Sequence, residues 1–319
     1  MKAAVVRGAG NIPVYADFAE PKAAVGEVRI TVTAAAMSQV VKSRASGRHY
    51  SSSGQFPFVA GVDGVGRLDD GRRVYFVFPR PPQGAMAERT VVAMDRCLPL
   101  PDGLDDVTAA ALANPGMSSW AALKERARLK TGETVLVNGA TGASGRLAVQ
   151  IARYLGAGKV IATGRNVEAL KAVAVLGADV TIPLVDDEAA LEGRFGAEFS
   201  QGVDVVLDYL WGKSAERLLV AGAKAGKEAH EIRFVQIGSM SGSDITLPSA
   251  VLRSSAIVLM GSGIGSIPFD RMVRAIDGVL QAAVPAGLKI EANPIPLSEV
   301  EQAWPRGDGI GRIVFTIGA

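Results

Sequence analysis

The sequence predicts an α/β protein with a β-rich first domain and a second domain built on a doubly wound parallel sheet. Residues 1–112 contain short apolar runs separated by glycine and proline turns, and helical periodicity is scarce there. From Glu133 onward, apolar runs of strand length alternate with helical patterns. That alternation is typical of parallel strands joined by right-handed helical crossovers.

The first domain should be mainly antiparallel. Its clearest predicted strands cover residues 3–6, 27–32, 73–78 and 87–92. A helix is predicted to begin at Asp105 and to be interrupted at Asn114-Pro115-Gly116, with a second helix over residues 118–129. The chain is expected to pass from the first domain to the second near this interruption.

The second domain should alternate strands and helices in chain order. Predicted strands cover residues 134–137, 159–163, 179–182, 203–207 and 234–237, and helices cover residues 147–155, 168–176, 187–195 and 215–223. The last clear helix covers residues 271–283. A final strand over residues 311–317 is expected to return to the first domain.

Composition limits the class of protein. The chain has 319 residues, about twice a typical domain, with 48% hydrophobic and 21% charged residues, as in soluble globular proteins. The net charge is +2, and no lysine and arginine cluster is interleaved with aromatic residues. We therefore expect no nucleic acid and no membrane among its partners.

The cysteine and histidine content points to a reducing compartment and against zinc. Cys97 is the only cysteine and there are two histidines, too few for a disulfide framework or a zinc ligand set. The N-terminal apolar run is too short for a signal peptide, and no stretch of eighteen apolar residues occurs. The expected location is the cytoplasm, and no metal site is expected.

Three glycines at three-residue spacing mark the candidate nucleotide site. Gly139, Gly142 and Gly145 follow the predicted strand at residues 134–137 and precede a helix. Glycines in such a turn let the backbone approach a phosphate, and the helix N-terminus offsets its charge. Plain tight turns share this composition. The expected cofactor contacts are Gly142, Ala143, Ser144 and Gly145.

The end of the second strand indicates which nucleotide is bound. Gly164, Arg165 and Asn166 lie roughly twenty residues past the last glycine, where a dinucleotide fold places the residue that reads the ribose. No carboxylate is present there to accept from a 2′-hydroxyl. Arginine instead suits a 2′-phosphate, which predicts NADPH with these three residues as contacts. The alternative is that Arg165 is a solvated residue at a strand end.

Two further strand ends are candidate cofactor contacts. Asp208, Tyr209 and Leu210 follow the apolar run at residues 203–207, and Gly238 and Ser239 follow the run at residues 234–237. Ligands of open α/β sheets bind at the carboxyl ends of the strands. A purely structural role for these residues is the alternative.

The ordered set of motifs resembles the medium-chain dehydrogenase/reductase superfamily, in its zinc-independent quinone oxidoreductase (zeta-crystallin-like) branch. The resemblance covers essentially the whole chain. It rests on MKA (1–3), GEVRITV (26–32), FPFVAGVDG (56–64), GAMAE (84–88), NPGMSSW (114–120), the glycine-rich turn, GVDVVLD (202–208) and PLSEVEQA (296–303).

The resemblance implies a domain layout and an assembly. A GroES-like catalytic domain would cover residues 1–115, an NADP(H)-binding Rossmann domain residues 116–262, and a C-terminal return completing the catalytic domain residues 263–319. The active site would lie in the cleft between the domains. Members of the family are commonly dimers, so a homodimer is expected.

Departures from the zinc-dependent members concern the metal ligands. Ser38 stands where those members carry a catalytic cysteine, and Gly61-Val62-Asp63 stands where they carry Gly-His-Glu. The four-cysteine structural zinc lobe is also missing. The resemblance therefore implies a zinc-independent enzyme.

Three residues are candidates for the catalytic group. His49 and Tyr50 lie in a loop rich in glycine and serine, residues 47–54, where either could donate a hydrogen bond to a carbonyl oxygen. Ser38 could be a polar contact to substrate or nicotinamide. The alternatives are ordinary exposed loop residues for the first two, and a buried serine satisfied by backbone for Ser38.

The reaction that fits is hydride transfer without a metal. The nicotinamide C4 would give a hydride to a quinone or an α,β-unsaturated carbonyl compound, and the cofactor would carry the hard chemistry. The alternative is a non-catalytic protein of the same fold that binds NADPH as a regulatory or sensing ligand. The polar residues usual in the cleft are lost here, at Ser38 and Val41, which favours that alternative.

Overall fold

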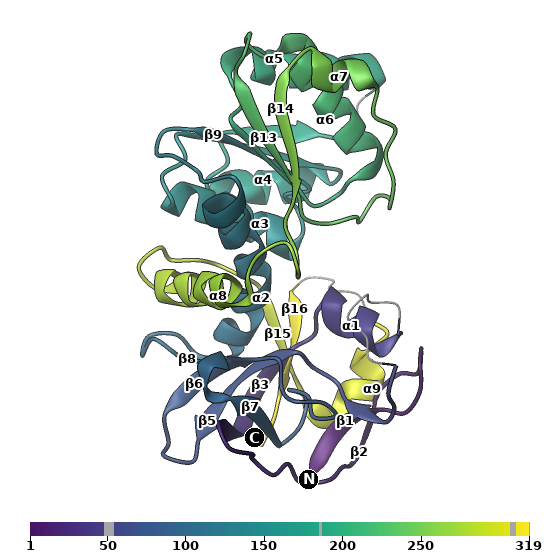
Figure 1. Ribbon diagram of the computed structural model, residues 1–319, viewed down its shortest axis with the longest axis vertical. Coiled ribbons are helices and arrows are strands. Elements are labelled where there is room, and N and C mark those ends of the chain that lie inside the picture. The colour runs from purple at the N-terminus through teal and green to yellow at the C-terminus, as the bar shows by residue number, and fades with distance from the viewer. Residues whose placement is uncertain (48–53, 185–186, 307–310, 319) are drawn as a thin grey trace. The chain divides into compact units, whose positions relative to one another are not determined.

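The computed structural model describes residues 1–47, 54–184, 187–306 and 311–318. Contacts between Cα atoms divide the chain into two compact units (Figure 1). The first unit is Met1–Asn114 with Leu280–Ala319, and the second unit is Pro115–Val279.

The first unit is built from two β-sheets. Its strands are β1 (Lys2–Val6), β2 (Val14–Asp17), β3 (Glu27–Ala36), β4 (Phe58–Val59), β5 (Asp63–Leu68), β6 (Arg73–Val77), β7 (Arg89–Ala93), β8 (Cys97–Pro99), β15 (Ala292–Pro296) and β16 (Arg312–Thr316). The larger sheet has the order β15-β16-β3-β5-β6-β8, with β7 also paired to β3, and the smaller has the order β2-β1-β4. Its helical elements are α1 (Gln39–Ala45), η1 (Met94–Arg96), η3 (Leu297–Glu299) and α9 (Val300–Ala303).

The C-terminal strand β16 completes this unit. It pairs antiparallel with β3, with Val314 opposite Ala36, and parallel with β15. Val314 and Phe315 are fully buried, so the return strand contributes core as well as hydrogen bonds. The predicted return to the first domain is confirmed.

The second unit is a doubly wound parallel sheet. Its strands are β9 (Thr134–Asn138), β10 (Lys159–Gly164), β11 (Val180–Pro183), β12 (Val205–Asp208), β13 (Glu231–Gln236) and β14 (Ala256–Gly261), and its helices include α3 (Ala143–Tyr154), α4 (Val167–Val175), α5 (Glu188–Gln201), α6 (Gly212–Ala225) and α7 (Ser249–Arg253). The order is β11-β10-β9-β12-β13-β14, and neighbouring strands run parallel. The predicted fold class is confirmed.

The order of this sheet places a topological switch point between β9 and β12. From β9 the chain adds β10 and then β11 on one side, and it later adds β12, β13 and β14 on the other. Ligands of such sheets bind beyond the carboxyl ends of the strands at the switch point. The β-branched run of β9 suits this central place, since Val135, Leu136 and Val137 are fully buried.

One predicted helix break is wrong. Helix α2 (Asp106–Ala121) runs without interruption through Pro115 and is followed by a π-helical turn, η2 (Ala122–Arg126). Its neighbour is α8 (Phe269–Ala283), because a Cβ atom on Gly116 would lie 2.6 Å from Cγ1 of Val279. Close packing between these helices offsets the hydrogen bond that the proline removes.

The boundaries of the compact units lie at 114/115 and 279/280, whereas the predicted domain boundaries lie at 115/116 and 262/263. The difference concerns the segment before Leu280. Within it, a Cβ atom on Gly278 would lie 2.6 Å from Cε2 of Trp120, so this part of α8 packs within the second unit. Within the described ranges, no helix has the length and apolar character needed to cross a membrane.

Candidate functional site

The turn after β9 leaves an open helix N-terminus. Gly142, the residue before α3, has extended backbone (φ −78°, ψ 168°), and no described side chain caps the helix. A Cβ atom on Gly142 would meet no described atom within 4 Å, so a ligand can approach from this side. Ala143 and Ser144 form the first turn and are partly exposed. Uncapped N–H groups and the positive end of the helix dipole together favour a phosphate.

Gly145 holds the first turn of α3 against the loop. A Cβ atom there would lie 2.3 Å from the carbonyl oxygen of Gly139, closer than any real contact. The third glycine of the motif is therefore required by packing, while Gly142 is clear of the described atoms on its Cβ side.

A buried polar network fixes the loop to its neighbouring strands. Nδ2 of Asn138 donates to Oδ1 of Asp208 over 2.8 Å, and Oγ1 of Thr163 donates to Oδ1 of Asn138 over 2.6 Å. Oγ1 of Thr163 also accepts from the backbone N–H of Gly139 over 3.2 Å. Burial raises the pKa of Asp208, and the hydrogen bond from Asn138 partly lowers it.

Asn138 and Thr163 are not among the contacts predicted from the sequence, whereas Asp208 belongs to a strand end predicted as a contact. Asn138, Thr163 and Asp208 each lie at or next to the last position of an apolar strand run, in β9, β10 and β12. Polar residues at the carboxyl ends of neighbouring parallel strands are the signal that identifies them.

Arg165 is a cation just beyond β10. It is exposed and makes no hydrogen bond or ion pair with any residue that the structure describes. Asn166 has a structural task, because its Oδ1 accepts from the N–H of Ala169 over 3.0 Å and caps α4. Gly164 is buried, and a Cβ atom on it would lie 2.5 Å from Cγ2 of Thr141.

Tyr209 and Leu210 follow β12 and support the turn. The hydroxyl of Tyr209 lies 3.4 Å from Oγ of Ser118, and burial raises its pKa to about 12, so the phenol stays neutral. Leu210 packs against the loop, since a Cβ atom on Gly139 would lie 2.8 Å from its Cγ. Beyond β13, Gly238 is in tight contact with this segment: a Cβ atom on it would lie 2.6 Å from the carbonyl oxygen of Tyr209.

All eleven predicted cofactor residues thus lie at or just beyond the carboxyl ends of β9, β10, β12 and β13, with Ser239 exposed at the last of these. N–H groups that can bind a phosphate, an exposed guanidinium and close-packed glycines therefore lie together at the carboxyl ends of the strands of this sheet. A dinucleotide with an additional phosphate fits this set of groups.

In the first unit, Ser38 acts as a helix cap. Its Oγ accepts from the N–H of Val41 over 3.2 Å, and the side chain is buried. The hydroxyl hydrogen remains available to donate. His49 and Tyr50 lie outside the residues that the structure describes.

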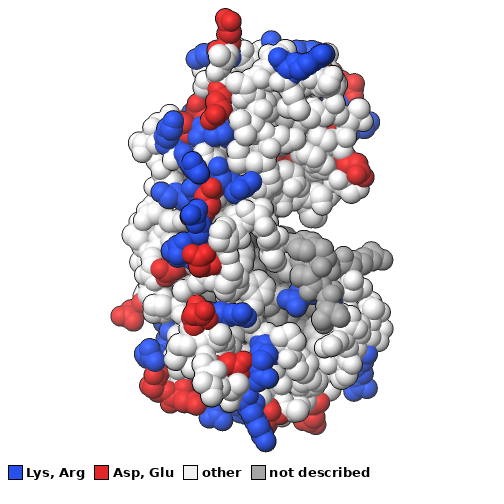
Figure 2. All heavy atoms as spheres, in the orientation of Figure 1, with Lys and Arg blue, Asp and Glu red and all other residues white. Residues whose placement is uncertain are grey.

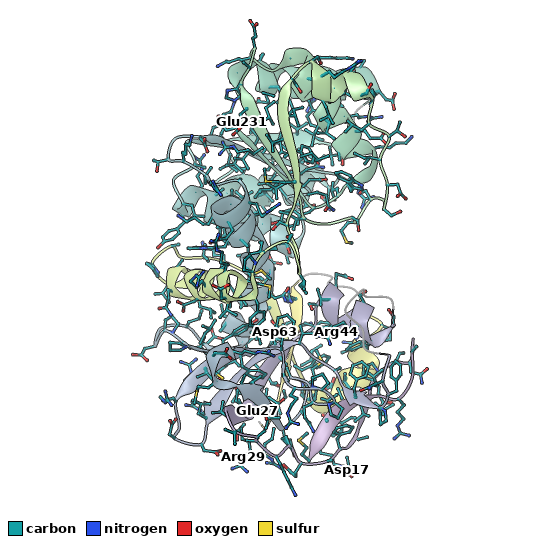
Figure 3. The ribbon with its side chains drawn as sticks, in the orientation of Figure 1. Asp17, Glu27, Arg29, Arg44, Asp63 and Glu231 are labelled. Atoms are coloured by element: carbon teal, nitrogen blue, oxygen red, sulfur yellow. The ribbon has the colours of Figure 1, made fainter. Side chains whose placement is uncertain are left out.

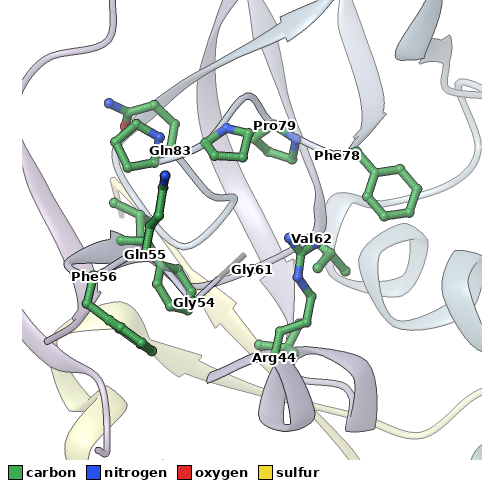
Figure 4. Close-up of a pocket in the computed structure, with 14 residues that line it drawn as sticks. Arg44, Gly54, Gln55, Phe56, Gly61, Val62, Phe78, Pro79 and Gln83 are labelled. Carbon is green, nitrogen blue, oxygen red and sulfur yellow. The ribbon is translucent and has the colours of Figure 1, made fainter. Parts of the chain in front are cut away.

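A pocket opens beside α1 in the first unit. Its empty volume is about 620 Å³, part of which is open to solvent, and its lining residues include Val41, Arg44, Phe56, Val62 and Phe78. Figure 4 shows the guanidinium of Arg44 reaching from α1 toward Val62. Arg44 is not among the site residues predicted from the sequence.

Asp63, which the sequence places at the third position of Gly61-Val62-Asp63, begins β5 and is buried (Figure 3). Its Oδ2 accepts a hydrogen bond from the hydroxyl of Tyr75, and Oδ1 has no partner among the described residues. Burial raises the pKa of this carboxyl, while the hydrogen bond from Tyr75 and the charge of Arg312 lower it in part.

Charge on the surface is mixed. On the face drawn in Figure 2, Lys and Arg side chains lie among Asp and Glu side chains. Among the described residues, no group of three or more His, Cys, Asp or Glu is arranged to hold a metal ion.

Comparison with known proteins identifies relatives over the whole chain. A family model described as zinc-binding dehydrogenase matches residues 143–279, within the second unit. The chain is 30% identical to the probable NADPH-dependent quinone reductase tdiC of Emericella nidulans, over 96% of each protein.

Solved structures agree. The quinone oxidoreductase from Thermus thermophilus, whose structures include a complex with NADPH, matches with a TM-score of 0.82 and 30% identity over 99% of this chain and 100% of that one. A probable oxidoreductase from Mycobacterium abscessus matches with a TM-score of 0.78 and 27% identity over 99% of both chains.

Proposed function

Because this chain belongs to the quinone oxidoreductase branch of the medium-chain dehydrogenase/reductase superfamily, we propose that it reduces a quinone or an α,β-unsaturated carbonyl compound. It is an oxidoreductase, and NADPH is its cofactor. The identity of the acceptor is the proposed part.

One observation supports the cofactor assignment from this chain's own residues. The uncapped N-terminus of α3 and the exposed Arg165 lie beyond the carboxyl ends of the neighbouring strands β9 and β10. The first suits the diphosphate and the second suits the 2′-phosphate. We assign cofactor contacts to the eleven predicted residues, with Asn138, Thr163 and Asp208 positioning the loop.

The proposed hydride transfer requires only two functions from the protein's own side chains. When bound, reduced nicotinamide supplies a hydride from C4 to the acceptor, and solvent supplies the proton that completes the two-electron reduction. The protein must orient the acceptor and offer a hydrogen bond to the oxygen on which negative charge grows. We propose Ser38, through its hydroxyl hydrogen, and His49 or Tyr50 for that contact.

We propose that the reaction is independent of zinc. Zinc needs three or four ligands with nitrogen, sulfur or carboxylate donors. Oγ of Ser38 already accepts from the N–H of Val41, and Val62 has no donor atom to offer a metal. The match to a family described as zinc-binding covers residues 143–279 and so includes neither of these positions.

We further propose a homodimer formed through β14. This strand ends the six-stranded sheet, and Val258 and Leu259 on it are 40% and 38% exposed. An apolar edge strand can pair with the same strand of a second copy about a two-fold axis.

We also propose that the protein works in a reducing compartment, the cytoplasm. Cys97 is a free cysteine, and burial raises the pKa of its thiol to about 11.

The test of the function is turnover. Purified protein is mixed with NADPH and either 2-methyl-1,4-naphthoquinone or 2-cyclohexen-1-one, and the loss of reduced-nicotinamide absorbance is followed. We expect turnover with at least one acceptor, a lower KM for NADPH than for NADH, and the same rate after dialysis against a chelator.

Two results would contradict the proposal. Tight NADPH binding without turnover of any quinone or enone would favour the sensing alternative. Loss of the rate on chelation, restored by zinc, would refute a metal-free reaction.

A further inference from the structure

The pocket beside α1 contains a cation that the described residues do not neutralise. Arg44 is partly buried and makes no hydrogen bond or ion pair with any described residue. No aspartate or glutamate is among the described residues that line this pocket. Burial lowers the pKa of Arg44, but a guanidinium stays charged at neutral pH. Removing such a charge from water without a partner is unfavourable, so an anion entering the pocket would be favoured.

Most of the other residues that line the pocket are apolar or aromatic. Phe56, Phe58 and Phe78 contribute to its lining, and the rings of Phe56 and Phe58 lie 5.5 Å apart between centroids. Such walls suit a planar ring system. Gln83 also lines the pocket, and its buried Oε1 has no hydrogen-bond partner among the described residues.

The pocket lies beside the helix that Ser38 caps, although Ser38 itself is not among the described lining residues. Ser38 caps α1, Val41 follows in its first turn, and Arg44 lies one turn further on the same face. Val62 also lines the pocket; it belongs to Gly61-Val62-Asp63, which stands where zinc-dependent members carry Gly-His-Glu. A molecule in this pocket would therefore lie beside the helix that Ser38 caps.

We propose that this pocket selects a planar aromatic acceptor carrying an anionic oxygen group, which Arg44 binds while the phenylalanine rings contact the ring system. The substrate class is thus an acidic quinone or enone, for example one bearing a carboxylate, rather than a neutral one. This inference rests on the proposed reductase function for turnover, but not for binding.

The test uses a matched pair of compounds, 1,4-naphthoquinone-6-carboxylate and its methyl ester, which differ in charge. For the intact protein, kcat/KM with NADPH and Kd from calorimetry are measured for both. We expect the carboxylate to be preferred over the ester, and Arg44→Leu to reduce that preference by about tenfold, as for loss of a charged hydrogen bond. Arg44→Lys should retain part of the preference.

A matched control removes a different arginine. Arg67 is exposed in β5 and donates to the carbonyl oxygen of Gly71, so Arg67→Leu should leave the preference unchanged. If both compounds are reduced but Arg44→Leu does not alter their ratio, the pocket assignment is wrong and the reductase function stands. If neither is reduced but the carboxylate binds in a way that depends on Arg44, the pocket assignment stands and the reductase function fails.

Discussion

At the scale of single residues, we propose that Arg165 determines the preference for NADPH over NADH. Its guanidinium is exposed and makes no ion pair with a described residue, and no carboxylate stands beside it in Gly164-Arg165-Asn166. Arg165→Ala should weaken the binding of NADPH by about 1–3 kcal/mol, the range for a charged hydrogen bond, and should leave the binding of NADH almost unchanged. Calorimetric Kd values for both nucleotides measure this.

A control for the arginine substitution is Arg253→Ala, at an exposed position in the short helix α7. It should change neither affinity. Equal losses for NADPH and NADH in the Arg165 variant would remove the assigned contact to the 2′-phosphate.

Asp63 predicts a dependence of stability on pH. Its folded-state pKa is raised, so the folded protein holds this proton at pH values where the unfolded chain has lost it. The contribution of protonated Asp63 to the free energy of unfolding is fully present below the pKa of the unfolded chain. It is lost as pH rises through the pKa of the folded protein. Asp63→Asn stays neutral, so its unfolding free energy should rise relative to that of the wild type as pH increases above about 4, the ordinary pKa of an aspartate.

Urea unfolding at a series of pH values gives this comparison. Other carboxyl groups titrate in both proteins and cancel in the difference. A difference in unfolding free energy that stays constant across the range would mean that Asp63 has an ordinary pKa.

Part of the residue-scale account was predictable from the sequence. The exposed position of Arg165 just beyond β10 was predictable, because the sequence places it after a strand, while its contact with the cofactor stays a prediction. The cap formed by Ser38 is not, because a serine after a strand is equally typical of a polar contact until the N–H of Val41 is located. Arg44 was not predicted because a lone arginine in a short helix has no sequence signal that separates a pocket wall from solvent.

At the scale of elements, the join between β9 and α3 depends on Gly145. A Cβ atom there would lie 2.3 Å from the carbonyl oxygen of Gly139, so a side chain must displace the loop. Gly145→Val should abolish binding of NADPH and NADH alike and lower stability by about 1–3 kcal/mol through overpacking. Calorimetry and thermal unfolding, with circular dichroism to confirm folding, measure the two effects.

Gly193→Ala is the matched control for that variant. Gly193 is exposed in α5, and a Cβ atom there would meet no described atom within 4 Å. It should leave binding unchanged and raise helix stability by roughly 0.5–1 kcal/mol. Retained nucleotide affinity in Gly145→Val would place the cofactor elsewhere.

Element prediction succeeded where local pattern decides and failed where tertiary contact decides. The buried run of β9 and the helical spacing of Leu147 and Ile151 were sufficient to predict β9 and α3. The uninterrupted α2 was not predictable, because Pro115 indicates a break and only the contact between Gly116 and Val279 explains why the helix continues.

At the scale of the whole molecule, the exposed edge of β14 predicts assembly. Val258→Lys places a charge on an apolar edge strand and should disfavour pairing with a second copy. We expect the wild type to sediment as a dimer and the variant to shift toward monomer. Val175→Lys is the control, because Val175 is 86% exposed at the end of α4, away from β14. This variant should remain a dimer. A monomeric wild type would end the dimer proposal.

The layout of the molecule was largely predictable, because the glycine-rich turn, the alternation of elements and the return strand are each local patterns. The segment before Leu280 was not, since its contact with Trp120 joins residues far apart in the chain. The acceptor also lies beyond local pattern, because it depends on the volume and charge of a pocket formed by several segments.

The most direct test of the central claim follows the hydride itself. NADPH deuterated at both C4 positions of the nicotinamide is supplied with a quinone and, separately, with an α,β-unsaturated ketone. We expect slower turnover than with unlabelled NADPH, and a saturated ketone one mass unit heavier with deuterium on its β-carbon. Equal rates together with an unlabelled product would contradict hydride transfer from the cofactor to the acceptor.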